Sequence, residues 1–150
     1  MGKEYAFEKN VRLGCRIMGV LLGLLLVTLP FGIWFWIKGG SGRLQFTDGG
    51  FRVNGLGLTA TEWNFSDIQR IGLLRVRVGG RGLGGVLGRM ISGGDEAVNV
   101  CCIDKNGKQK RFLVSRYEGA EEIVQQIAAG SGLTLETVSQ GLMGPKWQEA

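Results

Sequence analysis

The segment Ile17–Ile37 constrains this chain more than any other feature of its sequence. It reads IMGVLLGLLLVTLPFGIWFWI, contains no charged residue, and is bounded by Arg16 and Lys38. A helix of this length, at about 1.5 Å per residue, matches a hydrocarbon core about 30 Å thick. The segment therefore predicts a single transmembrane helix, which Pro30 kinks locally.

The ends of this segment support the same interpretation. The aromatic residues Trp34 and Trp36 lie at its carboxyl end, and such rings favour the headgroup boundary. A signal peptide would have a shorter apolar core and a cleavage site of small residues, whereas this core ends in Trp-Phe-Trp-Ile-Lys. We expect a single-pass protein of the cell (inner or plasma) membrane, with an anchor that includes Ile17, Leu25, Pro30, Trp34 and Trp36.

The orientation of the anchor is less constrained. Four basic residues precede the segment and three follow it closely, so the positive-inside rule barely discriminates. The cysteines Cys101 and Cys102 are neighbours in an apolar strand pattern and point to opposite faces, which makes a bridge between them unfavourable. Free thiols favour a reducing compartment. We therefore expect the domain behind the anchor to lie on the cytoplasmic side.

The length of the chain, 150 residues, leaves room for one small domain beside the membrane segment. We divide it into an N-terminal tail (1–16), the transmembrane helix (17–37), a glycine-rich flexible spacer (38–42), a domain (43–130) and a C-terminal extension (131–150).

Alternating apolar residues predict several short strands in this domain. Leu44 and Phe46, then Phe51 and Val53, flank Asp48-Gly49-Gly50 as in a hairpin. Further strands are predicted at 59–65 and 73–78, and Asn106-Gly107 joins strands 98–104 and 110–114 in a second hairpin. We expect six or seven strands in total, with Trp63 and Ile68 in the core.

A helix is predicted to follow these strands. Ser115 and Glu118 fit a capping box, Ile123, Val124 and Ile127 recur at helical spacing, and Gly130 fits a helix stop. Residues 133–143 predict a second short helix and 144–150 a loose tail. The stretch 79–94 contains eight glycines, so we expect it to be a long, mobile loop.

Three passages together resemble the bacterial pleckstrin-homology-like (PH-like) domains: the hairpin FTDGGFRV, the segment TEWNFSDIQRI, and the late hairpin followed by SRYEGAEEIVQQI. Asn64-Phe65 departs from the family's spacing in the second passage. The resemblance covers 44–129 and implies a mainly β (α+β) fold, a bent antiparallel sheet or small barrel capped by a C-terminal amphipathic helix. Many members carry membrane segments ahead of the domain. No catalytic motif is involved, so the resemblance implies architecture more than activity.

The residues Gly80–Gly85 fit the pattern G-x-G-x-x-G, which in a strand-helix-strand unit binds dinucleotides. The preceding strand LLRVRV alternates with arginine, whereas a central parallel strand is apolar on both faces. A glycine-rich loop is the interpretation we favour, and a small-ligand or nucleotide site is the alternative.

Enzymatic chemistry has little support in this sequence. The chain contains no histidine, the commonest metal ligand and neutral-pH base, and we predict no catalytic, cofactor-binding or metal-binding residue. Residues 70–94 contain five arginines and no carboxylate, and their aliphatic neighbours could enter a lipid interface. A solvated strand face with a disordered loop is the other interpretation.

We accordingly expect a membrane-anchored binding or scaffolding module that contacts the bilayer, and in particular anionic lipid headgroups or a membrane protein partner. Nucleic-acid binding is not expected, because aromatic residues do not alternate with the basic ones. The candidate contact residues are Arg75, Arg77, Arg81, Arg89, Leu83 and Leu87.

Overall fold

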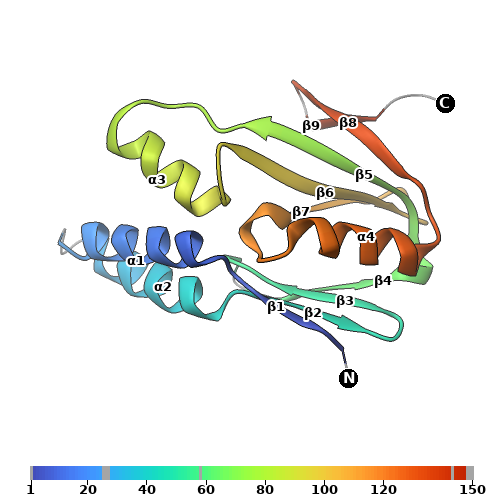
Figure 1. Ribbon diagram of the computed structural model, residues 1–150, viewed down its shortest axis with the longest axis horizontal. Coiled ribbons are helices and arrows are strands. Elements are labelled where there is room, and N and C mark those ends of the chain that lie inside the picture. The colour runs from blue at the N-terminus through green and yellow to red at the C-terminus, as the bar shows by residue number, and fades with distance from the viewer. Residues whose placement is uncertain (1, 25–27, 58, 143, 148–150) are drawn as a thin grey trace.

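The computed structural model describes residues 2–24, 28–57, 59–142 and 144–147. Within them the chain forms four helices and nine strands, arranged as two sheets with helices between and beside them. Figure 1 shows both sheets and α4 in the right-hand part of the molecule and α1, α2 and α3 together in the left-hand part. We call the first part the body and the second the helical lobe.

The first sheet is antiparallel throughout and runs in the order β1-β2-β3-β4. Its strands are β1 (Glu4–Ala6), β2 (Arg43–Thr47), β3 (Gly50–Asn54) and β4 (Thr61–Asn64). The predicted hairpin around Asp48 is confirmed, because Phe46 lies opposite Phe51 and Leu44 opposite Val53. Apolar residues of this sheet thus face one side, toward the interior.

The second sheet runs in the order β7-β6-β5-β8-β9. Its strands are β5 (Ile68–Arg77), β6 (Glu96–Asp104), β7 (Gln109–Leu113), β8 (Leu135–Gly141) and β9 (Gly144–Trp147). The Asn106-Gly107 hairpin is confirmed, and Gly107 has the positive φ of 76° that such a turn requires. Strand β8 pairs in parallel with β5, which the sequence did not indicate.

The core of the body lies between the two sheets and α4 (Ala120–Ser131). Phe51 is its centre, stacked on Trp63 at 5.4 Å between ring centroids and packed on Phe112 at 5.6 Å. Trp63 and Ile68 are buried, as predicted. Helix α4 contributes Ile123, Val124 and Ile127, which are the apolar residues identified from their spacing.

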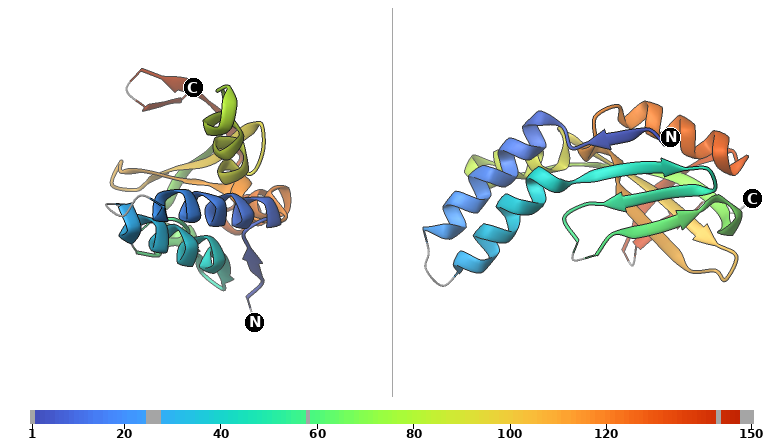
Figure 2. Two further views of the ribbon diagram at one scale, coloured as in Figure 1. Left: turned by 90° about the vertical axis from the view of Figure 1, so that its left-hand side faces the viewer. Right: turned by 90° about the horizontal axis from the view of Figure 1, so that it is seen from below.

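The predicted fold class is wrong, because the chain is a mixed α/β structure with two sheets and four helices rather than a mainly β domain behind one transmembrane helix. Between Arg43 and Ser131 six strands precede one terminal helix, the order that the PH-like resemblance implied, but α3 (Gly82–Ser92) interrupts them. Figure 2 shows this helix beside the first two.

The predicted transmembrane helix is also wrong. The segment Ile17–Ile37 is divided between α1 (Lys9–Gly23) and α2 (Leu29–Ser41), which run side by side as a hairpin (Figure 2). Among the described residues, no helix combines the length and apolarity needed to cross a bilayer. The expectation of a single-pass membrane protein is therefore contradicted. The expectation that the domain behind the anchor lies on the cytoplasmic side assumed that anchor and is no longer supported.

Pro30 accounts for part of this correction. It stands in the first turn of α2, where a proline loses no helical hydrogen bond, and so it begins a helix instead of kinking one. The hydroxyl of Thr28 donates to the carbonyl of Leu22 at the end of α1. The predicted spacer 38–42 differs as well, because Lys38 to Ser41 form the last turn of α2.

Other elements differ from the prediction for similar reasons. Residues 79–94 are not a loop, since α3 occupies 82–92. Helix α4 begins at Ala120 and not at Ser115, because Gly119 precedes it with a φ of 71° and residues 114–116 form a short 3₁₀ helix, η3 (Val114–Arg116). Residues 135–141 and 144–147 form β8 and β9 in place of a short helix and a loose tail, and residues 143 and 148–150 of those predictions lie outside the described residues.

Candidate functional site

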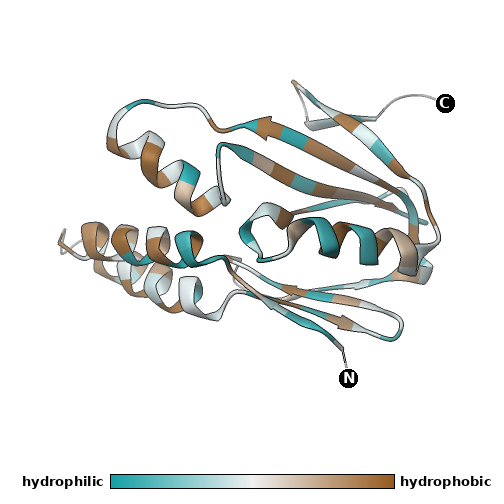
Figure 3. Ribbon diagram, in the orientation of Figure 1, coloured by the Kyte–Doolittle hydropathy of each residue, from teal (hydrophilic) through white to brown (hydrophobic). Residues whose placement is uncertain are grey.

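Large apolar side chains that face solvent are concentrated on the helical lobe. Among the described residues twelve such side chains are exposed, and nine of them lie on α1, α2 or the turn after α1. These are Leu13, Val20, Leu21, Leu24, Leu29, Phe31, Ile33, Trp36 and Ile37. Two more, Leu83 and Val86, lie on α3. In Figure 3 the ribbon of α1 and α2 is mostly hydrophobic toward their connection, whereas hydrophobic and hydrophilic residues alternate along the strands of the body.

The charges on the lobe all have one sign. Helices α1, α2 and α3 carry five basic residues and not one carboxylate side chain. The basic residues are Lys9, Arg12, Arg16, Lys38 and Arg89, and Arg81 directly precedes α3. An apolar surface on helices that carry only basic residues is therefore built from three segments that are distant in the sequence. Two of the basic residues pair with carboxylates outside these helices, Arg12 with Glu118 at 3.5 Å and Arg89 with Asp95 at 3.7 Å.

The charged residues of α1 and α2 lie away from the tip of the hairpin. Arg16 is the last charge on α1 and Lys38 the first on α2, so both helices are uncharged toward the tip. At 1.5 Å per residue this uncharged part is roughly 10–13 Å long. The guanidinium of Arg16 lies 5.7 Å from the ring centroid of Trp36 and marks the boundary between the apolar and the basic part.

Close helix contacts hold the lobe together. A Cβ on Gly32 would lie 2.6 Å from the carbonyl oxygen of Gly19, and one on Gly14 would lie 2.8 Å from Cβ of Met90 in α3. A Cβ on Gly39 would likewise overlap Cys15. These glycines let α1 lie against α2 on one side and α3 on the other, and apolar side chains are left facing outward.

The lobe is attached to the body through η3. The buried hydroxyl of Ser115 donates to the carbonyl of Ser92 at 2.6 Å and accepts from the backbone N–H of Val98 at 3.2 Å. The Nε of Arg116 donates to the carbonyl of Ile91 at 3.0 Å. The carbonyl of Arg116 in turn accepts from the N–H of Glu8, just before α1. One short turn thus fixes the end of α3 and the start of α1.

The predicted contact residues are only partly brought together. Arg75 pairs with Glu96 at 3.5 Å and Arg89 with Asp95 at 3.7 Å, so the folded chain supplies carboxylates that the local sequence lacks. Leu87 is buried, whereas Leu83 is 63% exposed.

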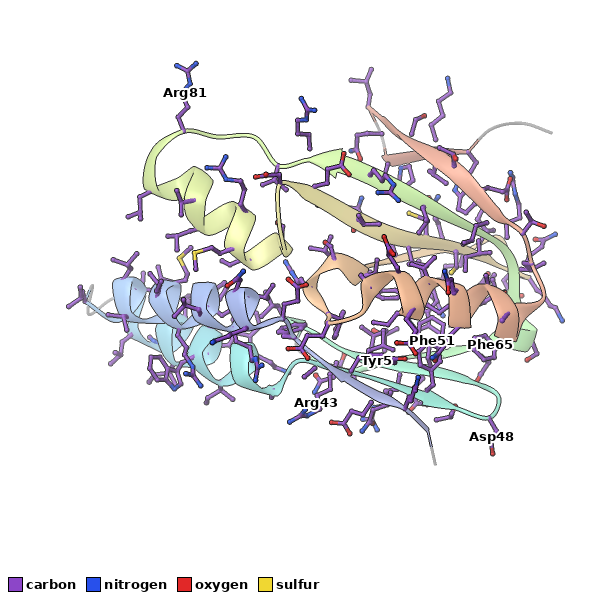
Figure 4. All side chains as sticks on the ribbon, in the orientation of Figure 1. Tyr5, Arg43, Asp48, Phe51, Phe65 and Arg81 are labelled. Carbon is purple, nitrogen blue, oxygen red and sulfur yellow. The ribbon has the colours of Figure 1, made fainter. Side chains whose placement is uncertain are left out.

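Arg77 and Arg81 have no ion-pair partner within the described residues. Arg81 points away from the molecule on the connection that leads into α3 (Figure 4). Of the predicted contact residues, it is Arg81, Arg89 and Leu83 that belong to the lobe surface, while Arg75 and Arg77 lie on β5.

The predicted anchor residues belong to the hairpin. Trp36 and Pro30 are exposed, Ile17 and Trp34 are half-buried, and Leu25 lies outside the described residues. Sequence reasoning found these apolar residues, but it missed their convergence with α3. No local signal could have revealed that contact, because Gly14 and Met90 are far apart in the chain.

The glycine pattern Gly80–Gly85 does not lie in the setting of a dinucleotide site. It leads into α3, but the strands on either side, β5 and β6, are antiparallel neighbours. The dinucleotide site needs a parallel strand-helix-strand unit. Gly80 and Gly85 instead let α3 begin close to the preceding backbone, where a Cβ on Gly85 would overlap Gly80.

Cys101 and Cys102 are free thiols, as expected, and Cys15 is also a free thiol; all three are buried. Burial raises the pKa of Cys102 to about 12 and also raises the pKa values of Cys15 and Cys101. Their thiolate forms are therefore scarce at neutral pH, which makes them poor nucleophiles.

Comparison with known proteins places the chain in no family. No family model matches it, and no curated protein matches it. Two chains of solved structures match, one of them from "Structure of the Spt16D Pob3N heterodimer". That alignment covers 73% of this chain and 52% of the other, with 15% identity and a TM-score of 0.39. The chain thus spans about half the length of that structural neighbour.

Proposed function

We propose that this chain is a binding module, and not an enzyme, whose helical lobe rests on an anionic lipid surface and dips the tip of the α1/α2 hairpin into it. The observation that carries the proposal is the concentration of exposed apolar side chains on helices that bear basic residues alone. Basic residues surrounding Trp, Phe and Leu are typical of helices that bind at a lipid interface.

The depth of the uncharged tip supports a peripheral contact. Interfacial helices bury their apolar faces about 5–10 Å into the boundary between headgroups and acyl chains. The uncharged part of the hairpin, roughly 10–13 Å long, reaches this depth but spans less than half of a core about 30 Å thick. Both ends of the hairpin then stay on the same side as the body.

The positions of Arg16, Lys38 and Trp36 fit the same depth. With the tip buried, the two cations lie at the level of the headgroups, and each adds about 1 kcal/mol of attraction to an anionic surface. Trp36 lies at that level as well, where an aromatic ring with a polar N–H is favoured. Arg81 adds positive charge on the side of α3, whereas Arg89 is paired with Asp95.

Cosedimentation of the full chain with protein-free vesicles tests the proposal. We expect binding to vesicles that contain phosphatidylglycerol, weaker binding to pure phosphatidylcholine, and a decrease with added salt. The double variant Leu24→Ser/Phe31→Ser should reduce binding at least tenfold, because these side chains are 75% and 61% exposed and contribute little to folding.

Leu142→Ser is the matched control. Leu142 is fully exposed on the turn between β8 and β9, outside the lobe, and its loss should leave vesicle binding within twofold. Equal recovery of the double variant and the wild type would refute the lipid contact. Binding to native membranes but not to protein-free vesicles would also refute it, and would identify a membrane protein as the partner.

A further inference from the structure

The outer face of the α1/α2 hairpin contains a groove of about 200 Å³. Its floor is formed by Gly19, Gly23 and Gly32, which carry no side chains. Its walls are the apolar side chains Val20, Leu29, Ile33 and Trp36. The groove is therefore apolar on every side, and it lies within the uncharged part of the hairpin that the proposed function buries in lipid.

The three glycines of the floor differ in how much space they leave. Gly19 and Gly32 are in contact with each other's backbones, so a side chain at either position would separate the helices. Among the described residues, a Cβ on Gly23 would meet one atom within 4 Å, Cδ1 of Leu29 at an ordinary 3.8 Å. No described residue therefore fills the space over Gly23, and the close helix contact does not explain why this position carries no side chain.

A cation stands at the wall of this groove. The guanidinium of Arg16 lies over the ring of Trp36, whose side chain forms one wall. Neither α1 nor α2 carries a carboxylate that would repel an anion beside Arg16. A ligand with an apolar chain and an anionic head would match both the apolar groove and the guanidinium of Arg16.

We infer that the groove binds one acyl chain of an anionic lipid, with the lipid headgroup against Arg16. The groove is smaller than the 300–1,000 Å³ typical of sites for drug-sized ligands, and no described residue of its lining has a charged, hydroxyl or amide side chain to orient one. A flexible chain needs no such group, since each methylene taken from water contributes about 0.8 kcal/mol. The inference rests on the proposed lipid contact and names the molecule that this surface recognises.

Titration calorimetry tests the inference. It measures the affinity of the full chain for a monoacyl phosphatidylglycerol below the micellar concentration of that lipid. Gly23→Leu should lower the affinity at least tenfold, because the new side chain fills the groove. Gly40→Leu is the matched control: Gly40 is an exposed glycine of α2 outside the groove, where a Cβ meets no atom within 4 Å. Its affinity should stay within twofold of wild type.

A second variant tests the inference even if Gly23→Leu does not fold. Arg16→Gln should abolish the preference for monoacyl phosphatidylglycerol over monoacyl phosphatidylcholine while weak binding of the chain persists. Equal affinities of Gly23→Leu and Gly40→Leu, with unchanged melting temperatures, would overturn the inference, as would an undiminished anionic preference in Arg16→Gln.

Different results would contradict the proposed acyl-chain groove and the proposed surface contact. Wild-type protein that binds anionic vesicles but not the monoacyl lipid contradicts the groove and leaves the proposed function standing. Protein that binds the monoacyl lipid but not vesicles supports the groove and contradicts the surface contact.

Discussion

The body and the helical lobe use apolar residues in opposite ways. In the body, aromatic rings such as Phe51 and Trp63 face inward and are nearly inaccessible to solvent. In the lobe, glycines occupy the contacts between helices, and residues such as Leu24 and Phe31 face outward. Side-chain burial therefore dominates in the body, whereas the lobe combines a few buried side chains, Val11, Cys15 and Leu87, with close backbone approach and leaves most of its large apolar side chains available to a partner.

This contrast predicts that stability and lipid binding can be separated by mutation. The largest effect should come from Trp63→Ala, which we expect to destabilise the protein by roughly 3–5 kcal/mol, the usual cost of truncating a core aromatic. Denaturant unfolding followed by circular dichroism measures this. The folded fraction of the variant should still bind anionic vesicles, because Trp63 lies in the body.

Trp63→Phe is the matched comparison for this position. The indole N–H of Trp63 is buried without a hydrogen-bond acceptor among the described residues, and phenylalanine removes that donor. We expect Trp63→Phe to lower the free energy of unfolding clearly less than Trp63→Ala does. An alanine variant as stable as the wild type would exclude Trp63 from the core.

A smaller effect is expected from Gly32→Ala in the lobe. Its Cβ would lie 2.6 Å from the carbonyl oxygen of Gly19, so α1 and α2 must separate at a cost of about 1–3 kcal/mol. Gly40→Ala, on the same helix but in open space, should be neutral or stabilising. If both variants melt at the same temperature, the glycine contact does not hold the hairpin together.

Ser115→Ala probes the connection between the two regions. The hydroxyl bridges Ser92 and the N–H of Val98, and its loss leaves both groups without that partner, at a cost of about 1–2 kcal/mol. We expect faster hydrogen exchange in α3, while β2 and β3 keep their protection. Uniform acceleration throughout the chain would mean that the lobe and the body unfold as one unit.

The smallest effect concerns pH and belongs to the body. Hydrogen bonds from Arg70 lower the pKa of Glu136 below its ordinary value of 4.5. A lowered carboxyl pKa stabilises the fold above about pH 4.5, and this contribution is lost as the pH falls through the folded-state pKa. Glu136→Gln should therefore melt slightly below wild type at neutral pH, and the difference should shrink in acid. A constant difference across this range would exclude the ion pair as its source.

Local signals in the sequence located much of the body. Alternation with turn glycines identified both hairpins, and helical spacing identified the buried face of α4, because each pattern reflects a neighbouring contact. The start of α4 was predicted too early because Ser115 serves a distant partner, Ser92, instead of capping a helix. Strand β8 was missed because its pairing with β5 is long-range.

The lobe was harder to predict because its structure depends on contacts between segments that are distant in the sequence. A run of apolar residues has the same hydropathy whether it spans a bilayer or folds back, and Thr28 with Pro30 was the only sign of a helix start. Helix α3 contains four glycines and is held by its contact with α1, which local propensity does not include. The candidate surface itself was partly predicted, since Leu83, Arg81 and the residues of the hairpin were all identified, but not as neighbours.

The pairing of β1 with β2 gives the hairpin an unusual position in the chain. Ala6 lies opposite Arg43, so α1 and α2 together form the connection of an antiparallel strand pair. The register of β1 on β2 is set by the strands and does not depend on how far the two helices extend. Matched turns added to or removed from both helices would therefore move the tip by about 5.4 Å at a time and keep this pairing. The reach of the tip is in this sense a dimension that design can set separately from the sheet.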